Sequence, residues 1–329
     1  MANINRSMTP QNTHKLGFGT WQFGGPNYVG GKPTGWGDFD AREATRAVHY
    51  ALDHGITFFD TADTYGRGQA ERFLGQALRS YAGSAKAVIC TKFGNREVQP
   101  DVFVKDYSPQ YLYQCVAASL DRLACQQLDT LLIHSPDDVF DWTNHDPQPY
   151  QRLLQQGVIG AYGVSSRSVY GARKVVEAGF GTVIELTYNA IDRRAESELF
   201  DQTAFDKYQF VARVPLASGF LNPKYLLQDP VFQDNEYRRF MAHTDQSWLL
   251  AQVRRLGFLD DLEGGMAVSA LRFALTHPRV GRVIPGMRTV AQVAQNLLAT
   301  QLGPLPDDVL KKIIETVPDV PDHWKPKVQ

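Results

Sequence analysis

Short apolar runs alternate with amphipathic helical patterns along almost the whole of this 329-residue chain. The first run ends at Thr20-Trp21, and Asp40 and Glu43 then have the spacing of a capping box at the start of a helix. Short apolar runs between helical patterns are typical of buried strands. The alternation predicts strands at residues 16–21, 56–60, 87–92, 130–134, 160–165, 182–187, 209–214 and 280–284.

Helices are expected between these strands. Ser108-Pro109 supplies an N-cap and a first-turn proline for one of them. Thr289 and Gln292 form a second box-like start near the C-terminus. Further helical patterns cover residues 70–79, 149–156, 170–178, 197–205, 266–276 and 289–298.

Eight strand-then-helix units indicate a parallel sheet with helical crossovers, and eight units close into a (β/α)8 TIM barrel. A doubly wound open sheet is the alternative α/β fold. Its Gly-x-Gly-x-x-Gly fingerprint fails here, because Gln22 occupies the last position after Gly17 and Gly19. We therefore expect a single barrel domain over residues 1–329. An elaborated loop with one or two extra helices, one starting near 245–256, would fill residues 221–265, and an extended tail at 318–329 would fold over the barrel mouth.

The charge balance and the cysteines limit the partners and the compartment. The 34 basic and 35 acidic residues nearly cancel, which argues against nucleic acid or an anionic membrane as a partner. Cys90, Cys115 and Cys125 are odd in number and lack metal-site spacing, so a reducing compartment is expected. The sequence has no signal-peptide pattern and no apolar run of about 20 residues. A cytoplasmic enzyme acting on a small molecule is expected, and the sequence does not indicate whether it is a monomer or a homo-oligomer.

Four chemically active side chains stand at or just after three successive expected strand ends: Asp60, Tyr65, Lys92 and His134. In a barrel these strand ends meet at one mouth. A nearby Lys92 ammonium would lower the pKa of the Tyr65 phenol, and Asp60 would keep that lysine charged. His134 could donate to a substrate oxygen or relay a proton. Together the four groups would hold a carbonyl oxygen while a nicotinamide cofactor reduces the carbon.

Each of these residues has a structural explanation when it is taken alone. Asp60 could cap a helix, Lys92 could be an exposed lysine, and His134 could be a satisfied core histidine. Their joint occurrence at successive strand ends favours the catalytic interpretation. A metal-dependent barrel hydrolase is disfavoured because no His-x-His pair occurs, and a serine hydrolase because no Gly-x-Ser-x-Gly occurs.

The segments around these residues resemble the aldo-keto reductase family, in that family's order. The resemblance implies a (β/α)8 barrel with a catalytic tetrad of Asp60, Tyr65, Lys92 and His134, and Tyr65 would be the general acid in reduction. It rests on LGFGTW (16–21), FFDTADTYG (58–66), TKFG (91–94), LLIHSPD (131–137), GVSS (163–166), TYN (187–189), VPLASGFL (214–221) and IPGMRT (284–289).

The resemblance also assigns a nicotinamide cofactor. Thr20 and Trp21 would border the nicotinamide, Ser165 would reach its carboxamide, and Tyr188 would stack on the ring. An arginine at Arg288 can pair with a 2′-phosphate, which favours NADPH (NADP+) over NADH, although NADH stays possible. The pyrophosphate and adenosine positions would be Leu216, Ser218, Gly219, Gly286, Arg288, Gln292 and Asn296.

Two positions depart from the family pattern. Ser166 stands where an Asn is usual after Gly-Val-Ser, and Glu185 stands where a Gln is usual. Both positions normally contact the carboxamide. An ionised Glu185 can accept from the amide NH2 but cannot donate to the carbonyl. We therefore expect the nicotinamide to be held differently, or less tightly, in this chain.

The expected substrate pocket has apolar walls and one cation. Trp21, Trp36 and Phe93 would line it, and Arg96 would attract a hydroxyl-rich or anionic substrate. The leading hypothesis is an NADPH-dependent aldo-keto reductase that converts an aldehyde or ketone to an alcohol. Two alternatives stay open at this point: a sugar or alcohol dehydrogenase running in the oxidative direction, and a cofactor-binding regulatory subunit of a channel.

Overall fold

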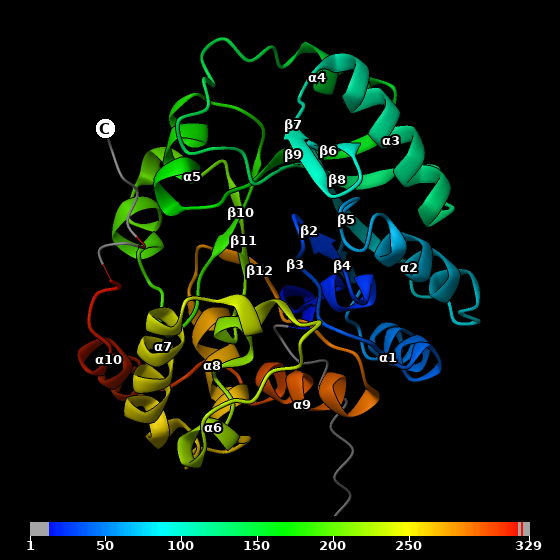
Figure 1. Ribbon diagram of the computed structural model, residues 1–329. Helices are drawn as coiled ribbons and strands as arrows, with labels where there is room; N and C mark the ends of the chain where they lie inside the picture. The colour runs from blue at the N-terminus through cyan, green and yellow to red at the C-terminus, as the bar shows by residue number, and fades with distance from the viewer. Residues whose placement is uncertain (1–12, 322–323, 325–329) are drawn as a thin grey trace, which may run out of the picture.

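The computed structural model describes residues 13–321 and residue 324, and a parallel eight-stranded sheet lies at its centre (Figure 1). Each strand pairs with the next one along the chain. Parallel bridges join Leu16 to Val283 and Gly19 to Gly286, so the first and last strands meet and the barrel closes. The predicted eight-unit barrel is confirmed. Its strands are β1 Gly17–Gly19, β4 Phe58–Asp60, β5 Val88–Phe93, β8 Leu128–His134, β9 Ile159–Ser165, β10 Val183–Thr187, β11 Gln209–Arg213 and β12 Val280–Ile284.

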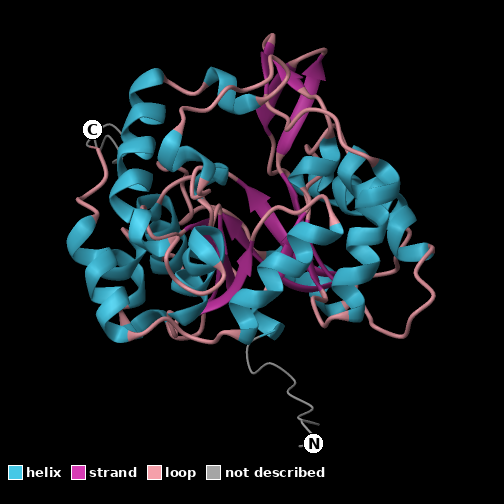
Figure 2. Cartoon of the chain, turned by 90° about the horizontal axis from the view of Figure 1, so that it is seen from below, coloured by secondary structure: helices cyan, strands magenta, loops and turns pink. Residues whose placement is uncertain are grey.

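Helices surround the barrel in both ribbon views (Figure 1, Figure 2). The prediction of one helix over residues 197–205 is wrong, because a π-helical turn at Glu196–Phe200 and a 3-10 turn at Thr203–Phe205 lie there instead. α10 at Asp307–Thr316 was not anticipated by the strand-helix pattern. The helices that follow the barrel strands include α1 Ala41–Asp53, α2 Gln69–Arg79, α3 Pro109–Leu123, α4 Gln148–Gln155, α5 Val169–Glu177, α8 Gly265–Thr276 and α9 Val290–Gln301.

The predicted N-caps form, but one capping box is only half made. The Asp40 side chain accepts from the backbone N–H groups of Arg42 and Glu43, which satisfies the first turn of α1. The box would have Glu43 reach back to Asp40. Glu43 instead accepts from the backbone N–H of Val290 at 2.9 Å and so links α1 to α9. The contact between α1 and α9 has therefore replaced the Glu43–Asp40 hydrogen bond of the capping box.

Side chains alternate between the barrel interior and the helical layer, and this alternation positions the site. The interior holds a small apolar cluster of Phe58, Cys90, Leu132, Val183, Val211 and Ile284. Because the side-chain period of a strand is two, the residue two places on points into the barrel as well. Those positions, at the carboxyl ends of the strands, are Asp60, Lys92, His134, Glu185, Arg213 and Gly286.

Inserted segments surround the mouth of the barrel. A hairpin of β6 (Asn95–Gln99) and β7 (Val102–Lys105) projects from the body of the protein in Figure 2. A second small hairpin pairs β2 (Tyr28–Val29) with β3 (Lys32–Pro33).

The predicted elaborated loop at 221–265 contains two α-helices, within the one or two expected, and the second covers most of the predicted 245–256 stretch. Its elements are α6 Lys224–Leu227, a 3-10 turn at Tyr237–Phe240, α7 His243–Arg255 and a 3-10 turn at Leu256–Leu259. Trp36 bridges to Glu236, so the loop meets the segment after β3.

The C-terminal tail is described only in part. Trp324 packs on Trp248 of α7, with ring centroids 5.0 Å apart, and its indole N–H donates to Asp245. Residues 322–323 and 325–329, on which much of the predicted tail falls, lie outside the described residues. Among the helices of the described chain, none combines the length and the apolar character needed to cross a bilayer.

Candidate active site

A pocket of about 460 Å³ opens at the carboxyl ends of the strands. Strand-end side chains line its base, and loops after β1, β11 and β12 supply the rest of its wall. Asp60, Tyr65, His134, Glu185 and Arg213 are among the lining residues. The period-two alternation places four of them there directly, and the turn after β4 brings in Tyr65. This is the end of a barrel at which active sites are built.

The four predicted tetrad residues come together. The Lys92 ammonium lies 2.5 Å from Asp60 Oδ1 and also donates to the Thr61 carbonyl at 2.9 Å. It lies 5.3 Å from the centroid of the Tyr65 ring. The His134 ring stands edge-on to Tyr65, with centroids 5.8 Å apart. His134 Nδ1 shares a 3.2 Å hydrogen bond with the Thr64 hydroxyl.

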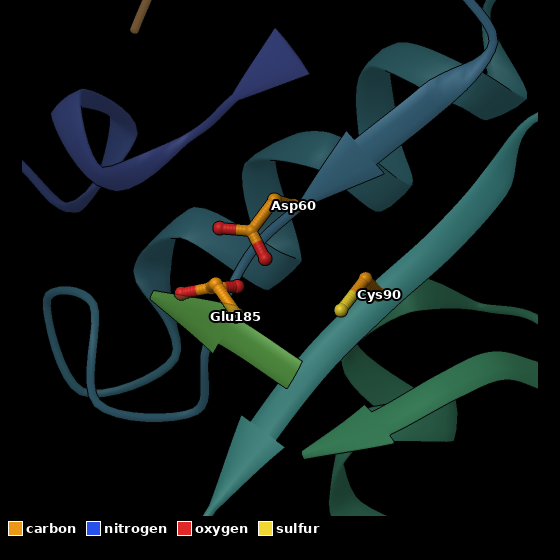
Figure 3. A group of neighbouring side chains, drawn as sticks. All are labelled: Asp60, Cys90 and Glu185. Atoms are coloured by element: carbon orange, nitrogen blue, oxygen red, sulfur yellow. The ribbon is translucent and has the colours of Figure 1, made fainter. Parts of the chain in front are cut away.

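A third charged group, Glu185, contacts Lys92 from an interior-facing position on β10. Its Oε2 lies 3.4 Å from Lys92 Nζ, and its Oε1 accepts from the Ser165 hydroxyl at 2.8 Å. Figure 3 shows Asp60, Cys90 and Glu185 pointing toward one another from three strands. Their ligand atoms lie within 4.8 Å of one another, which is metal-site spacing. The Lys92 ammonium bonded to these carboxylates would repel a metal ion, so we read the cluster as an ion-pair network.

Burial and neighbouring charges together shift the pKa values of Asp60 and Lys92. Desolvation and the Glu185 carboxylate raise the pKa of Asp60 to about 8, against the opposing effect of Lys92. The pKa of Lys92 is raised well above its ordinary value, because the two carboxylates outweigh the cost of burying the ammonium. Lys92 therefore stays charged. Its single positive charge faces two carboxyl groups, Asp60 and Glu185, and can balance only one negative charge.

Tyr65 and His134 are both neutral near neutral pH. Burial raises the pKa of Tyr65 above its ordinary value, and Lys92 only partly offsets this. The expectation that Lys92 would lower the tyrosine pKa is therefore wrong for the net shift, because desolvation is the larger effect. Burial and the charges of Lys92, Lys105 and Arg213 lower the pKa of His134 well below its usual range.

The raised pKa of Asp60 leads to a stability prediction. Between the ordinary carboxyl pKa of about 3.9 and about 8, the folded protein binds more protons than the unfolded chain, so the free energy of unfolding falls as pH rises through that window. Glu185→Gln removes one cause of the raised pKa. We expect the variant to gain stability relative to the wild type, by about 1–3 kcal/mol more at about pH 9 than at about pH 5.

Urea unfolding at those two pH values would measure this difference. Glu315→Gln is a matched control, since Glu315 is an exposed partner of Lys311 on α10. A gain in Glu185→Gln that is equal at both pH values would contradict the coupling of Glu185 to Asp60.

Most of the predicted cofactor and substrate positions outside the tetrad line the pocket. Val214, Ala217 and Ser218 have positive φ values of 55°, 47° and 56°, so the loop after β11 is a strained, left-handed segment. Such strain is concentrated at ligand-binding loops. The predicted residues on the wall are Trp21, Trp36, Glu185, Leu216, Ser218, Gly219, Gly286, Arg288 and Gln292.

Four of the residues predicted to lie beside the nicotinamide are not on the pocket wall. Tyr188 lies one place beyond the interior-facing Thr187, so it points outward: its ring packs on Phe200 and Phe273, and its hydroxyl donates to Glu196. The other three, Thr20, Ser165 and Ser166, are fully buried and lie outside the pocket wall, and their hydroxyls donate to Asp60 O, Glu185 Oε1 and Ser168 O.

Three further predicted site residues also lie off the pocket wall, each for its own reason. Phe93 follows the inward-facing Lys92 and so faces the helical layer, where it packs near Tyr150. Arg96 lies on the β6 strand of the projecting hairpin and pairs with Asp106 at 3.0 Å. Asn296 is buried on α9 and does not line the pocket, although Gln292 one turn earlier does.

Several lining residues were missed from the sequence. Arg213 ends β11 and points inward, and it could have been found by counting two places on from Val211. Arg238, a second such residue, comes with its neighbour Tyr237 from the 221–265 loop, where no local pattern marks them. The Tyr237 ring lies 4.8 Å from Trp21 and 5.0 Å from Trp36, so the three form an aromatic wall beside Tyr65.

The barrel and its buried lysine-carboxylate pair beside a tyrosine and a histidine define an oxidoreductase of the aldo/keto reductase type. The model described as "Aldo/keto reductase family" matches residues 15–317, and the chain belongs to that family. Members are oxidoreductases that use nicotinamide cofactors.

Among its relatives is an uncharacterized oxidoreductase of Mycobacterium tuberculosis, which is 30% identical over 301 residues, covering 88% of this chain and 84% of that protein. The solved aldo-keto reductase AKR11C1 from Bacillus halodurans, in its holo form, matches with a TM-score of 0.74 and 25% identity over 93% of each chain. The glycerol dehydrogenase AKR11B4 from Gluconobacter oxydans matches with a TM-score of 0.72 and 27% identity over 92% of this chain and 90% of that one.

Proposed function

We propose that this protein is an NADPH-dependent reductase of aldehydes or ketones, in which Tyr65 supplies the proton. The observation that carries the proposal is the convergence of Tyr65, Asp60 and His134 on one pocket, with Lys92 fully buried behind them against Asp60. A protonated tyrosine beside a fixed cation can give up its proton at the moment when negative charge develops on a carbonyl oxygen.

The residues along the pocket fit a nicotinamide dinucleotide phosphate. Ala217 and Ser218 have left-handed φ values, and Ser218 and Gly219 line the pocket; successive backbone N–H groups in such a turn would suit pyrophosphate binding. Arg288 lines the pocket, and its guanidinium donates to the backbone carbonyls of Trp36 and Asp38 and forms no salt bridge with a carboxylate of the described residues. When bound, the cofactor supplies the hydride for the carbonyl carbon.

The protein groups would then divide the proton chemistry. Tyr65 would donate its hydroxyl proton to the substrate oxygen, and Lys92 would stabilise the phenolate that remains. His134 would donate a hydrogen bond to the same oxygen from Nε2. For this tautomer the Thr64 hydroxyl must donate to Nδ1, which the 3.2 Å contact allows. The aromatic wall of Trp21, Trp36 and Tyr237 would pack against an apolar part of the substrate.

The oxidative direction is a second candidate, because the similar Gluconobacter protein is a glycerol dehydrogenase. The same groups serve both directions, with Tyr65 as phenolate base in oxidation. Two assays test the two directions. The first measures NADPH and NADH consumption with aromatic, aliphatic and sugar aldehydes and with ketones. The second measures NADP+ and NAD+ reduction with polyols. Turnover that disappears in Tyr65→Phe would support the assignment. Tight NADPH binding without turnover in either direction would count against it and would favour a regulatory role.

We expect Arg288→Ala to raise the KM for NADPH about tenfold or more and to change the KM for NADH little. A charge-assisted hydrogen bond to phosphate contributes about 1.5–3 kcal/mol. NADH has no 2′-phosphate, so its binding does not depend on this hydrogen bond. Steady-state kinetics with both cofactors would measure the effect. Arg254→Ala is the matched control, since Arg254 is an exposed arginine of α7 paired with Asp229. An equal rise in both KM values would show that Arg288 does not bind the 2′-phosphate.

A further inference from the structure

Four buried polar atoms of residues that line the pocket have no hydrogen-bond partner within the described chain: Oε1 of Gln22, Nε1 of Trp36, Oε2 of Glu185 and Nε of Arg213. Two of them belong to neighbouring strand ends: Oε2 of Glu185, an acceptor whose contact with the Lys92 ammonium is an ion pair at 3.4 Å, and Nε of Arg213, a donor. Both residues line the pocket. They stand on adjacent paired strands, β10 and β11, at interior-facing positions near the carboxyl ends. Buried donors and acceptors without a protein partner are uncommon and call for an explanation, and a ligand is one such explanation.

The Arg213 guanidinium is held in place but not neutralised. Its terminal NH2 donates to the Ser166 carbonyl at 3.1 Å, which anchors the side chain to the end of β9. Within residues 13–321 and residue 324, no carboxylate lies within ion-pair distance of it. Its charge nevertheless acts on the reacting groups, because it contributes to lowering the pKa of His134. Arg213 is therefore a fixed cation beside the tetrad.

The hydroxyl groups that could have served a ligand at this point are already used. Ser165 donates to the other oxygen of Glu185, and Ser166 donates to the Ser168 carbonyl. Neither serine lines the pocket. At the ends of β9, β10 and β11, the described polar side chains that line the pocket are Glu185 and Arg213. One of them can only accept when ionised, and the other can only donate.

A primary carboxamide has the complementary pair of groups, an NH2 that donates and a carbonyl that accepts. We propose that Glu185 accepts from the NH2 of the nicotinamide carboxamide and that Arg213 donates to its carbonyl, so that an ionic pair holds the group in place of an uncharged amide side chain. This inference rests on the proposed function, since it concerns the same cofactor. Arg213 is not among the residues that the family resemblance places at the cofactor.

The pair also sets which redox state of the cofactor binds better. The oxidised ring carries a positive charge and the reduced ring is neutral, so the Arg213 cation disfavours NADP+ and the Glu185 carboxylate favours it. Removal of the two charges should therefore have opposite effects. Arg213→Gln should lower the ratio of the Kd for NADP+ to the Kd for NADPH, and Glu185→Gln should raise it.

The test is equilibrium binding by calorimetry, with four ligands. NADPH and NADP+ contain the carboxamide, the 3-acetylpyridine analogue of NADP+ replaces the NH2 with a methyl group, and 2′,5′-ADP has no nicotinamide. The variants are Arg213→Met, Arg213→Gln, Glu185→Met and Glu185→Gln. Arg282→Met is the matched control, because Arg282 lies on β12, the strand next to β11, and does not line the pocket.

We expect Arg213→Met to weaken NADPH binding at least about tenfold, as for loss of a hydrogen bond to a charged group, and to leave 2′,5′-ADP binding within about twofold. The wild type should bind NADP+ more tightly than the acetylpyridine analogue. That preference should disappear in Glu185→Met and persist in Arg213→Met and Glu185→Gln, since glutamine keeps an acceptor oxygen.

Two results would overturn the inference while the proposed function stands: an unchanged NADPH affinity in Arg213→Met, or an equal loss for 2′,5′-ADP. Retention of the preference for NADP+ over its analogue in Glu185→Met would remove Glu185 from the pair. If the wild type binds neither NADPH nor 2′,5′-ADP, the proposed function fails and the inference fails with it. Circular dichroism of each variant separates loss of contact from loss of fold.

Discussion

Replacing Tyr65 with Phe is expected to lower kcat for carbonyl reduction by about 10²–10⁴-fold and to leave the Kd for NADPH nearly unchanged. The substitution removes only the hydroxyl that would deliver the proton. No side-chain hydrogen bond in the described chain depends on that hydroxyl, and the phenyl ring keeps its packing on Trp21. The loss should therefore lie in the chemical step rather than in binding or folding.

Single-turnover kinetics and cofactor titration would separate these effects. Tyr162→Phe is the matched control, because Tyr162 packs on Tyr150 outside the barrel and does not line the pocket. Turnover in Tyr65→Phe within about threefold of the wild type would contradict the proton-donor assignment. The raised pKa of Tyr65 is consistent with a donor that stays protonated until the substrate oxygen gains charge.

Replacing Lys92 with Met is expected to lower the free energy of unfolding by about 3–5 kcal/mol near neutral pH, and to reduce kcat as well. Lys92 is fully buried, and its ammonium is the cation paired with both Asp60 and Glu185. Its removal leaves two buried carboxyl groups facing one another, which must take up protons or repel. The phenolate form of Tyr65 also loses the nearest cation.

A double variant tests the cause of the instability. Lys92→Met combined with Glu185→Gln removes one of the stranded carboxylates, so it should unfold at higher urea concentration than Lys92→Met alone. If the double variant is no more stable than the single one, Glu185 does not share the lysine. A loss of stability below about 1 kcal/mol in Lys92→Met would show that the network contributes little to folding.

The order of the strands and the tetrad could be predicted because both depend on local patterns. Apolar runs, N-caps such as Ser108 and helical periodicity follow from neighbouring residues, and parallel strands bring their carboxyl ends together by geometry alone. The helix predicted at 197–205 failed because its backbone adopts a π-helical turn and then a 3-10 turn instead of one regular α-helix. The 221–265 loop had no repeat from which its contacts with Trp36 could be derived.

Two of the predicted residues that do not line the pocket, Tyr188 and Phe93, share one physical cause. In a strand, a shift of one residue moves a side chain from the barrel interior to the helical layer. Both residues follow strand ends, but each lies one place out of phase with an inward-facing residue. Arg213 is in phase with Val211 and lines the pocket, although it precedes the family-like segment that begins at Val214. For these three residues, parity within the barrel decides whether the side chain reaches the pocket.

The sequence by itself determined the barrel, the order of its units and the meeting of Asp60, Tyr65, Lys92 and His134, because strand periodicity and parallel topology fix these features locally. Only the tertiary structure decided how the charges are balanced. The second carboxylate on Lys92 comes from Glu185, far along the chain, and the net pKa of Tyr65 depends on burial by many segments at once. Such effects arise from three-dimensional proximity and from the exclusion of water, and neither can be read from neighbouring residues.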